Sequence, residues 1–232
     1  MRQFEQATHR KADAVVAVSH YTARAYADGL RVAPPRVIIN GVDTELFHPE
    51  SHPQQECFSS ERPFRLLFVG NMTRRKGADM IPEIMARLGP GFEVSYTAGL
   101  RAADPFPDLA NARKLGKLTQ EGVRAEYRRA DALLFPTRLE GLPLVAIEAM
   151  ACGTPVIACR TASLPEVIEH EHNGMLCTLD DPNSFAAAIH RLRNDPPLLA
   201  QLGENARACA QEKFSLPRMV QRYVELFSEI TA

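Results

Sequence analysis

The chain has 232 residues, of which 45% are hydrophobic and 24% are charged, which is typical of a folded, soluble protein rather than a disordered one. With 27 Lys and Arg against 28 Asp and Glu, the net charge of -1 excludes a global basic field. We therefore expect no nucleic-acid partner, and any anion site must be local.

Targeting and metal-binding patterns are missing from the sequence. No run approaches the ~20 apolar residues of a membrane helix, and residues 1–16 lack the apolar stretch of a signal peptide. We expect a cytoplasmic protein, and peripheral association with the inner membrane surface stays open. The Cys residues form no C-x-x-C pair and the His residues show no metal-ligand spacing, which predicts free thiols and no metal site.

Residues 1–33 predict one strand followed by one helix. The apolar run at 14–18 is too short for a core helix and is typical of a buried parallel strand. Ser19 is suited to cap a helix over 21–30. One strand and one helix cannot form a domain alone, so we interpret this region as the remnant of a larger domain.

Residues 34–63 are predicted to connect two units. They contain a second short strand at 37–39 and a turn signal at Asn40-Gly41. From Thr44 to Pro63 the sequence is polar and contains prolines, as a linker does.

From residue 64 to 232, short apolar strands alternate with helices. The predicted strands cover 65–69, 92–98, 113–118, 132–136, 155–158 and 174–177, and the predicted helices cover 78–88, 121–129, 144–151, 164–168 and 182–193. The strands are apolar throughout rather than on one face, which predicts an α/β, Rossmann-like parallel sheet with helices on both faces. Right-handed crossovers then place the loops after the strands along one edge, where such sheets bind ligands.

The loop from Gly70 to Gly77 is the first candidate site. It follows a predicted strand, precedes a predicted helix, and carries the consecutive cations Arg74, Arg75 and Lys76. Free amides at a helix start combined with cationic side chains suit a diphosphate. A solvated basic loop without a ligand remains the alternative.

The second candidate is the stretch from Glu140 to Glu148. Gly141 allows a ligand to approach the backbone, and Pro143 fits the first turn of a helix. One carboxylate could bind sugar hydroxyls and the other ribose hydroxyls. The alternative is a solvated loop acid and an acid placed by the helix dipole. For Glu166, a place in the first turn of a short helix is favoured over a ligand contact.

The ordered set of motifs resembles the retaining GT-B glycosyltransferases of family 4, also called group 1. The motifs run through Val37–Asp43, the Gly70–Gly77 loop, Glu140 to Ala158, Leu164–Val167, Asn173–Leu176 and Phe214-Ser215. The resemblance implies two Rossmann-like domains that face a cleft, and this chain would hold mainly the C-terminal, donor-binding domain. It covers about residues 14 to 228.

The resemblance also implies roles for individual residues. Lys76 with Arg74 or Arg75 would hold the diphosphate of a UDP-, GDP- or ADP-sugar, and Glu140 would contact the donor sugar as the catalytic residue. The segment Gly141, Leu142, Pro143 and Leu144 would lie along sugar and phosphate, Glu148 would hold the ribose, and Lys117 and Leu118 would border the base. The implied reaction moves a hexose, with retention, to a glycan or lipid-linked acceptor in polysaccharide biosynthesis. It implies no metal and no other cofactor.

Three features depart from the family pattern. Asn71 stands where the family often has Arg, so Arg74 or Arg75 would supply that charge while Asn71 stays in the predicted site. Ala162-Ser163 replaces a Gly-Gly pair. Only about residues 12–30 correspond to the acceptor domain, so the chain is a fragment, pairs with a chain that supplies the missing half, or is a non-catalytic nucleotide-binding or interaction subunit of GT-B fold. Another GT-B enzyme, such as an epimerase or phosphorylase, is a further alternative.

Overall fold

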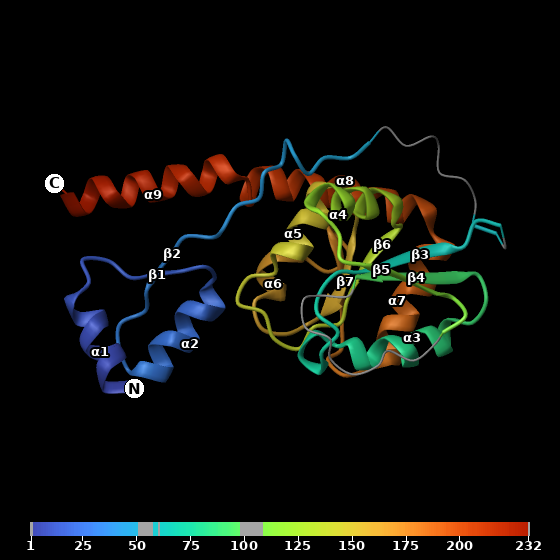
Figure 1. The fold of residues 1–232 in the computed structure, drawn as a ribbon. Coiled ribbons are helices and arrows are strands. Elements are labelled where there is room, and N and C mark those ends of the chain that lie inside the picture. The colour runs from blue at the N-terminus through green and yellow to red at the C-terminus, as the bar shows by residue number, and fades with distance from the viewer. Residues whose placement is uncertain (1, 51–57, 60, 98–108, 232) are drawn as a thin grey trace.

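The computed structural model describes residues 2–50, 58–59, 61–97 and 109–231. Figure 1 shows a small N-terminal lobe and a large lobe, which are joined by an extended connection and by a long C-terminal helix. The predicted strand end at Ala98 and the predicted free thiol of Cys57 lie outside the described residues.

The small lobe is built from two helices and two short strands. These are α1 (Arg2–Lys11), β1 (Val16–Ala17), α2 (His20–Leu30) and β2 (Arg36–Val37). β1 and β2 pair in parallel. The expectation of a single helix in this region was wrong, because α1 precedes the strand. α1 is mostly polar and therefore lacks the apolar periodicity that predicts a helix. A hydrogen bond of 2.5 Å from Gln6 Nε2 to the Leu30 carbonyl helps to hold α1 against α2.

The large lobe contains the main sheet and most of the buried core. Its described strands are β3 (Phe64–Phe68), β4 (Phe92–Thr97), β5 (Ala112–Gly116), β6 (Ala132–Phe135), β7 (Val156–Cys159) and β8 (Gly174–Cys177). All neighbouring pairs are parallel, and β6, β7 and β8 are buried along their whole length. The predicted parallel, Rossmann-like α/β sheet is confirmed.

The order of the strands determines where ligands can bind. Across the sheet the order is β5-β4-β3-β6-β7-β8, so the chain builds outward from β3 in one direction and then restarts at β6 in the other. Doubly wound sheets bind ligands at the carboxyl edge, beside the loops that follow two such strands, so a ligand is expected at the loops after β3 and β6. These two loops contain Arg74–Lys76 and Glu140.

Helices cover both faces of the sheet. α3 (Ile81–Leu88) and α7 (Pro182–Asn194) pack together on one face, and α4 (Gln120–Arg129), α5 (Leu144–Ala151) and α8 (Pro196–Lys213) pack on the other. The helix predicted over 78–88 is split into a 3₁₀ turn, η2 (Ala78–Met80), followed by α3, because Pro82 lies in the first turn of α3 and lacks an amide hydrogen. In the described part of the chain, no helix is both long and apolar enough to cross a membrane.

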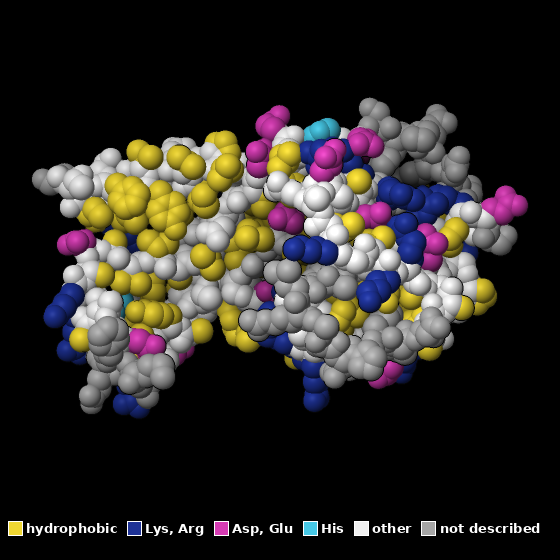
Figure 2. Space-filling model, viewed as in Figure 1, with side chains coloured by type: hydrophobic (Ala, Val, Ile, Leu, Met, Phe, Trp, Pro, Cys, Tyr) yellow, Lys and Arg dark blue, Asp and Glu magenta, His cyan; other side chains and the backbone are white. Residues whose placement is uncertain are grey.

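The last helix, α9 (Leu216–Thr231), extends from the large lobe back over the small one (Figure 1). The Arg36 guanidinium on β2 pairs with the Glu229 carboxylate on α9. Figure 2 shows hydrophobic side chains gathered along this helix. The exposed large hydrophobic residues of α9 are Leu216, Val220, Val224, Phe227 and Ile230.

Candidate functional site

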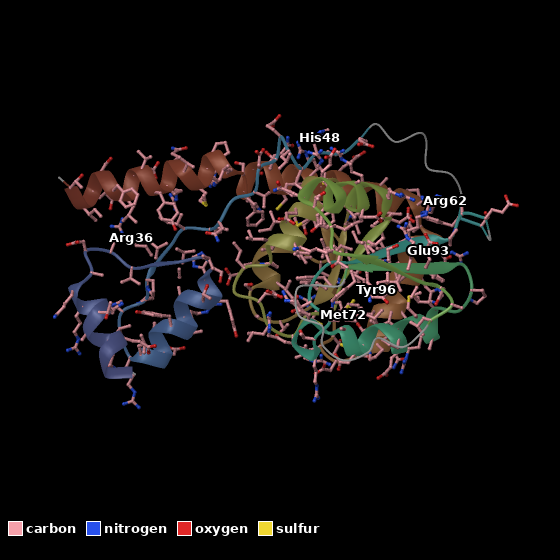
Figure 3. The ribbon with its side chains drawn as sticks, viewed as in Figure 1. Arg36, His48, Arg62, Met72, Glu93 and Tyr96 are labelled. Atoms are coloured by element: carbon pink, nitrogen blue, oxygen red, sulfur yellow. The ribbon has the colours of Figure 1, made fainter. Side chains whose placement is uncertain are left out.

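The candidate site lies at the carboxyl ends of β3 and β6. Figure 3 labels Arg62 and Glu93 at the amino ends of β3 and β4, and Met72 and Tyr96 toward the opposite end, where the site lies. After β3 the chain forms a 3₁₀ turn, η1 (Arg74–Lys76), which is capped by the Thr73 hydroxyl.

Gly77 explains how the two loops come together. It ends η1 with φ of 75°, and a Cβ atom built there would lie 2.0 Å from the carbonyl oxygen of Pro136, at the end of β6. The Arg138 amide also donates to the Arg75 carbonyl, at 2.9 Å. The basic turn therefore packs directly on the backbone that leads to Glu140.

Lys76 and Glu140 form the central contact of the site. The Lys76 Nζ atom lies 2.5 Å from Glu140 Oε1, and their side chains are only 15% and 10% exposed. The Thr137 hydroxyl donates to the same carboxylate oxygen at 2.8 Å, and Arg75 Nη1 lies 3.8 Å from it. The structure thus brings together Arg75, Lys76 and Glu140, which the sequence singled out. It also pairs the buried Glu140 carboxylate with the Lys76 ammonium.

Arg138 holds the basic turn, and sequence reasoning missed it. Its guanidinium binds the Asp79 carboxylate at 2.7 and 2.9 Å and Asp180 at 2.6 Å, and it also donates to the Arg74 carbonyl. The bond to Asp79, followed by the bond to Asp180, raises the pKa of Arg138. These partners are 59 and 42 residues away in sequence, so no local pattern pointed to the contact.

Glu148 lies on α5, where Tyr127 of α4 binds it. The Tyr127 hydroxyl donates to Glu148 Oε2 at 2.9 Å. Burial raises the pKa of the Glu148 carboxyl, while the bond from Tyr127 lowers it. Burial, together with the Glu148 charge, raises the pKa of Tyr127 well above its usual value. Tyr127 is fully buried, and sequence reasoning did not identify it as a partner.

The segment after Glu140 leads into α5. Gly141 and Leu142 are half-buried, and Leu144 is 38% exposed at the helix start. Pro143 is the N-cap of α5 rather than a residue of its first turn, because its ψ of 76° is not helical. The Gly141 carbonyl accepts a bond of 2.6 Å from the Ser19 hydroxyl of the small lobe.

The remaining predicted residues lie after the strands of the main sheet or in a short helix. Asn71 is half-buried, three residues before η1 begins. Lys117 and Leu118 follow β5, the edge strand, two strands away from β3. The strand predicted over 113–118 ends earlier, at Gly116, whose φ of 72° breaks the extended backbone. Glu166 lies in the first turn of the short helix α6 (Leu164–Val167), as favoured from the sequence, and contacts α2.

A cavity of about 820 Å³ lies at the opposite, amino end of the sheet. Two of the arginines that line it already bind protein groups: Arg62 pairs with Asp131 at 2.7 Å, and Arg128 pairs with Glu50. Figure 3 labels Arg62 and His48 in this region. These contacts hold the connecting segment to the large lobe. Among the residues described, no group of three His, Cys, Asp or Glu side chains could hold a metal ion.

The fold and the site together define a doubly wound protein of the GT-B type. Its basic turn faces a carboxylate at the switch point of the sheet, between β3 and β6, where the order of the strands changes direction. Residues 63–195 match the family described as "Glycosyl transferases group 1", and residues 1–46 match "Glycosyltransferase Family 4". The chain belongs to the group 1 glycosyltransferase family.

Individual relatives agree with this assignment. The chain is 39% identical to a D-inositol 3-phosphate glycosyltransferase of Streptomyces bingchenggensis over 83% of this chain and 47% of the relative. It is 28% identical to an uncharacterized glycosyltransferase of Methanocaldococcus jannaschii over 99% of this chain and 63% of the relative. The chain therefore spans about half to two thirds of the length of these relatives.

Solved structures show the same fold. Sucrose-phosphate synthase from Thermosynechococcus elongatus superposes with a TM-score of 0.84 at 26% identity, covering 99% of this chain and 61% of the synthase. Anabaena HepE in complex with UDP-glucose superposes with a TM-score of 0.82 at 20% identity, covering 98% of this chain and 67% of HepE. At that identity the second likeness concerns the fold alone.

Proposed function

We propose that this chain binds a nucleotide-diphosphate sugar at the carboxyl edge of the main sheet, beside the loops after β3 and β6. It would thereby supply the donor-binding half of a retaining hexosyltransferase. The observation that carries the proposal is the buried pair of Lys76 and Glu140, which places a cation and a carboxylate side by side at the switch point. The similarity of the chain to glycosyltransferases also supports it.

The pair provides both groups that a sugar diphosphate needs. In the structure Lys76 is neutralised by Glu140. A bound diphosphate would compete for the ammonium, with Arg75, whose side chain is 53% exposed, as a further cation. The Glu140 carboxylate would then be free to accept hydrogen bonds from the sugar hydroxyls. Arg74 and Asn71 would complete the phosphate side.

The other half of the donor would lie toward α5. The Tyr127 hydroxyl already donates a hydrogen bond to Glu148 Oε2. We therefore assign the other carboxylate oxygen, Oε1, as the acceptor for the ribose hydroxyls. The backbone from Gly141 to Leu144 would follow the sugar and phosphate, and Lys117 with Leu118 would border the base. We propose no requirement for a metal or for any other cofactor.

The transfer itself would need the acceptor half of the enzyme. The bond between the anomeric carbon and the donor phosphate would break, and a bond to the acceptor oxygen would form on the same face. The acceptor's proton would pass to the departing phosphate oxygen. We propose a glycan or lipid-linked acceptor that is bound by a domain preceding these residues or by a partner chain.

Calorimetric titration of the chain with UDP, GDP and ADP, with and without Mg²⁺, tests the donor site. We expect one nucleotide to bind in the micromolar-to-millimolar range without a need for Mg²⁺. We further expect Lys76→Ala and Glu148→Ala to weaken this binding by about tenfold or more. Glu121→Ala, on the exposed side of α4, serves as a matched loss of one carboxylate.

Two results would contradict the proposal. The first is a folded chain that binds none of the three nucleotides, which would favour a non-catalytic interaction subunit. The second is a Glu148→Ala variant that binds as tightly as the Glu121→Ala control, which would refute the assignment of Glu148 to the ribose.

A further inference from the structure

The free backbone amides at the start of α2, in the small lobe, are hydrogen-bonded largely by a residue of the large lobe. The amides of His20 and Tyr21 donate to the two carboxylate oxygens of Glu166, at 2.8 and 2.6 Å. The Thr22 amide donates to the Ser19 hydroxyl at 3.0 Å. An anionic group at a helix start also interacts favourably with the helix dipole. Glu166 therefore anchors the start of α2 on the large lobe.

Ser19 links this anchored helix start to the donor loop. Its side chain is fully buried, and its hydroxyl donates to the Gly141 carbonyl at 2.6 Å, across 122 residues of sequence. A hydroxyl has a single proton, so it can accept from the Thr22 amide while it donates to Gly141. Ser19 thus caps α2 and holds the loop at the same time.

A second serine holds the neighbouring peptide of the loop. The Ser163 hydroxyl, also fully buried, donates to the Glu140 carbonyl at 3.0 Å. In a trans peptide the N–H points opposite to the C=O, so fixing the carbonyls of Glu140 and Gly141 also fixes the directions of the Gly141 and Leu142 amides. The two serines thereby set the orientation of both peptide planes directly after the Lys76–Glu140 pair.

We propose that Ser19 is a positioning residue which couples the small lobe to the donor loop. By holding the Gly141 carbonyl it would orient the backbone that contacts the sugar of the donor. This inference rests on the proposed donor site. It assigns a role in donor binding to a residue outside the large lobe and outside the predicted site. Glu166 would support it by fixing the start of α2.

Two substitutions separate the loop contact from the helix cap. Ser19→Gly removes the hydroxyl but keeps a residue that is well tolerated as an N-cap. Ser19→Thr keeps the hydroxyl and should restore the contact. Thr22→Val is the matched control, because it removes a neighbouring hydroxyl that bonds to Ser19 but does not bond to Gly141.

The readout is the affinity for UDP-glucose compared with the affinity for UDP, measured by calorimetry. We expect Ser19→Gly to weaken UDP-glucose binding by about tenfold while UDP binding changes by less than about twofold. Ser19→Thr and Thr22→Val should behave like the original chain. A role that is merely structural would weaken the binding of both ligands equally. An unchanged ratio of the UDP-glucose affinity to the UDP affinity would therefore overturn the inference.

Amide hydrogen exchange gives a second test that does not need a nucleotide. The segment 139–143 should exchange faster in Ser19→Gly than in Thr22→Val, and Ser163→Ala should accelerate the same segment. Equal rates in all variants would refute the positioning role even if the chain binds no nucleotide. Failure of the original chain to bind any of UDP, GDP and ADP would instead refute the donor site itself, so the two failures are distinguishable.

Discussion

Lys76 Nζ lies 2.5 Å from Glu140 Oε1, although 64 residues separate the two in sequence. Thr137 also donates to this oxygen at 2.8 Å. Both charged side chains are mostly buried, so each depends on the other for compensation.

This dependence predicts non-additive effects on stability. Lys76→Ala should lower the free energy of unfolding by about 2–4 kcal/mol, because it leaves the buried Glu140 carboxylate without its cation. The double variant with Glu140→Ala should recover part of this loss, because no unpaired charge remains. Urea denaturation of the single and double variants measures the coupling. Additive losses would show that the two side chains do not depend on each other.

Tyr127→Phe should change how nucleotide binding depends on pH. Burial raises the pKa of Glu148, and the Tyr127 bond opposes this rise, so its removal should raise that pKa further. If binding needs the ionised carboxylate, affinity is lost as pH falls through this pKa, and the loss should begin at a higher pH in Tyr127→Phe. Titrations with UDP between about pH 4.5 and 8 would measure this shift. Superimposable pH profiles would argue against Glu148 as a ligand group.

Gly77→Ala and Gly89→Ala together test how the loops pack. Both glycines have positive φ, 75° and 72°, but a Cβ at Gly77 would lie 2.0 Å from the Pro136 carbonyl oxygen, whereas a Cβ at Gly89 would meet nothing within 4 Å. Gly89 has ψ of -158°, in a region that essentially only glycine adopts, so Gly89→Ala should cost about 1–3 kcal/mol of stability from backbone strain and leave nucleotide binding unchanged. Gly77→Ala should cost about 3 kcal/mol or more and should also weaken nucleotide binding. Nucleotide binding that is unaffected in both variants would contradict the close packing.

The buried thiols should be unreactive in the folded protein. Burial raises the pKa values of Cys152, Cys159 and Cys177 to about 12. At pH 8 only about one molecule in 10⁴ would carry a given thiolate. Native protein treated with iodoacetamide at pH 8 should therefore retain these thiols, whereas guanidinium-unfolded protein should react at all of them. A Cys57→Ser background removes the thiol outside the described residues, and rapid native labelling of Cys152, Cys159 or Cys177 would contradict their burial.

Much of the fold could be predicted from local pattern. Short apolar strands separated by helices allow few arrangements other than a parallel sheet with right-handed crossovers, and β3 to β8 form one. The basic turn at 74–76 and the carboxylate at 140 were found for the same reason, since each follows a buried strand at the edge where ligands bind. The polar helix α1 was missed because it lacks the apolar periodicity on which such predictions depend.

The sequence by itself determined the alternation of strands and helices, and therefore which loops reach the carboxyl edge of the sheet. Only the tertiary structure decided the partners there: Glu140 with Lys76, Glu148 with Tyr127, and Gly141 with Ser19. The physical reason is that alternation is encoded within a few residues, whereas these contacts join positions 64, 21 and 122 residues apart. The order of the strands and the docking of the lobes bring such positions together, and no local pattern records either.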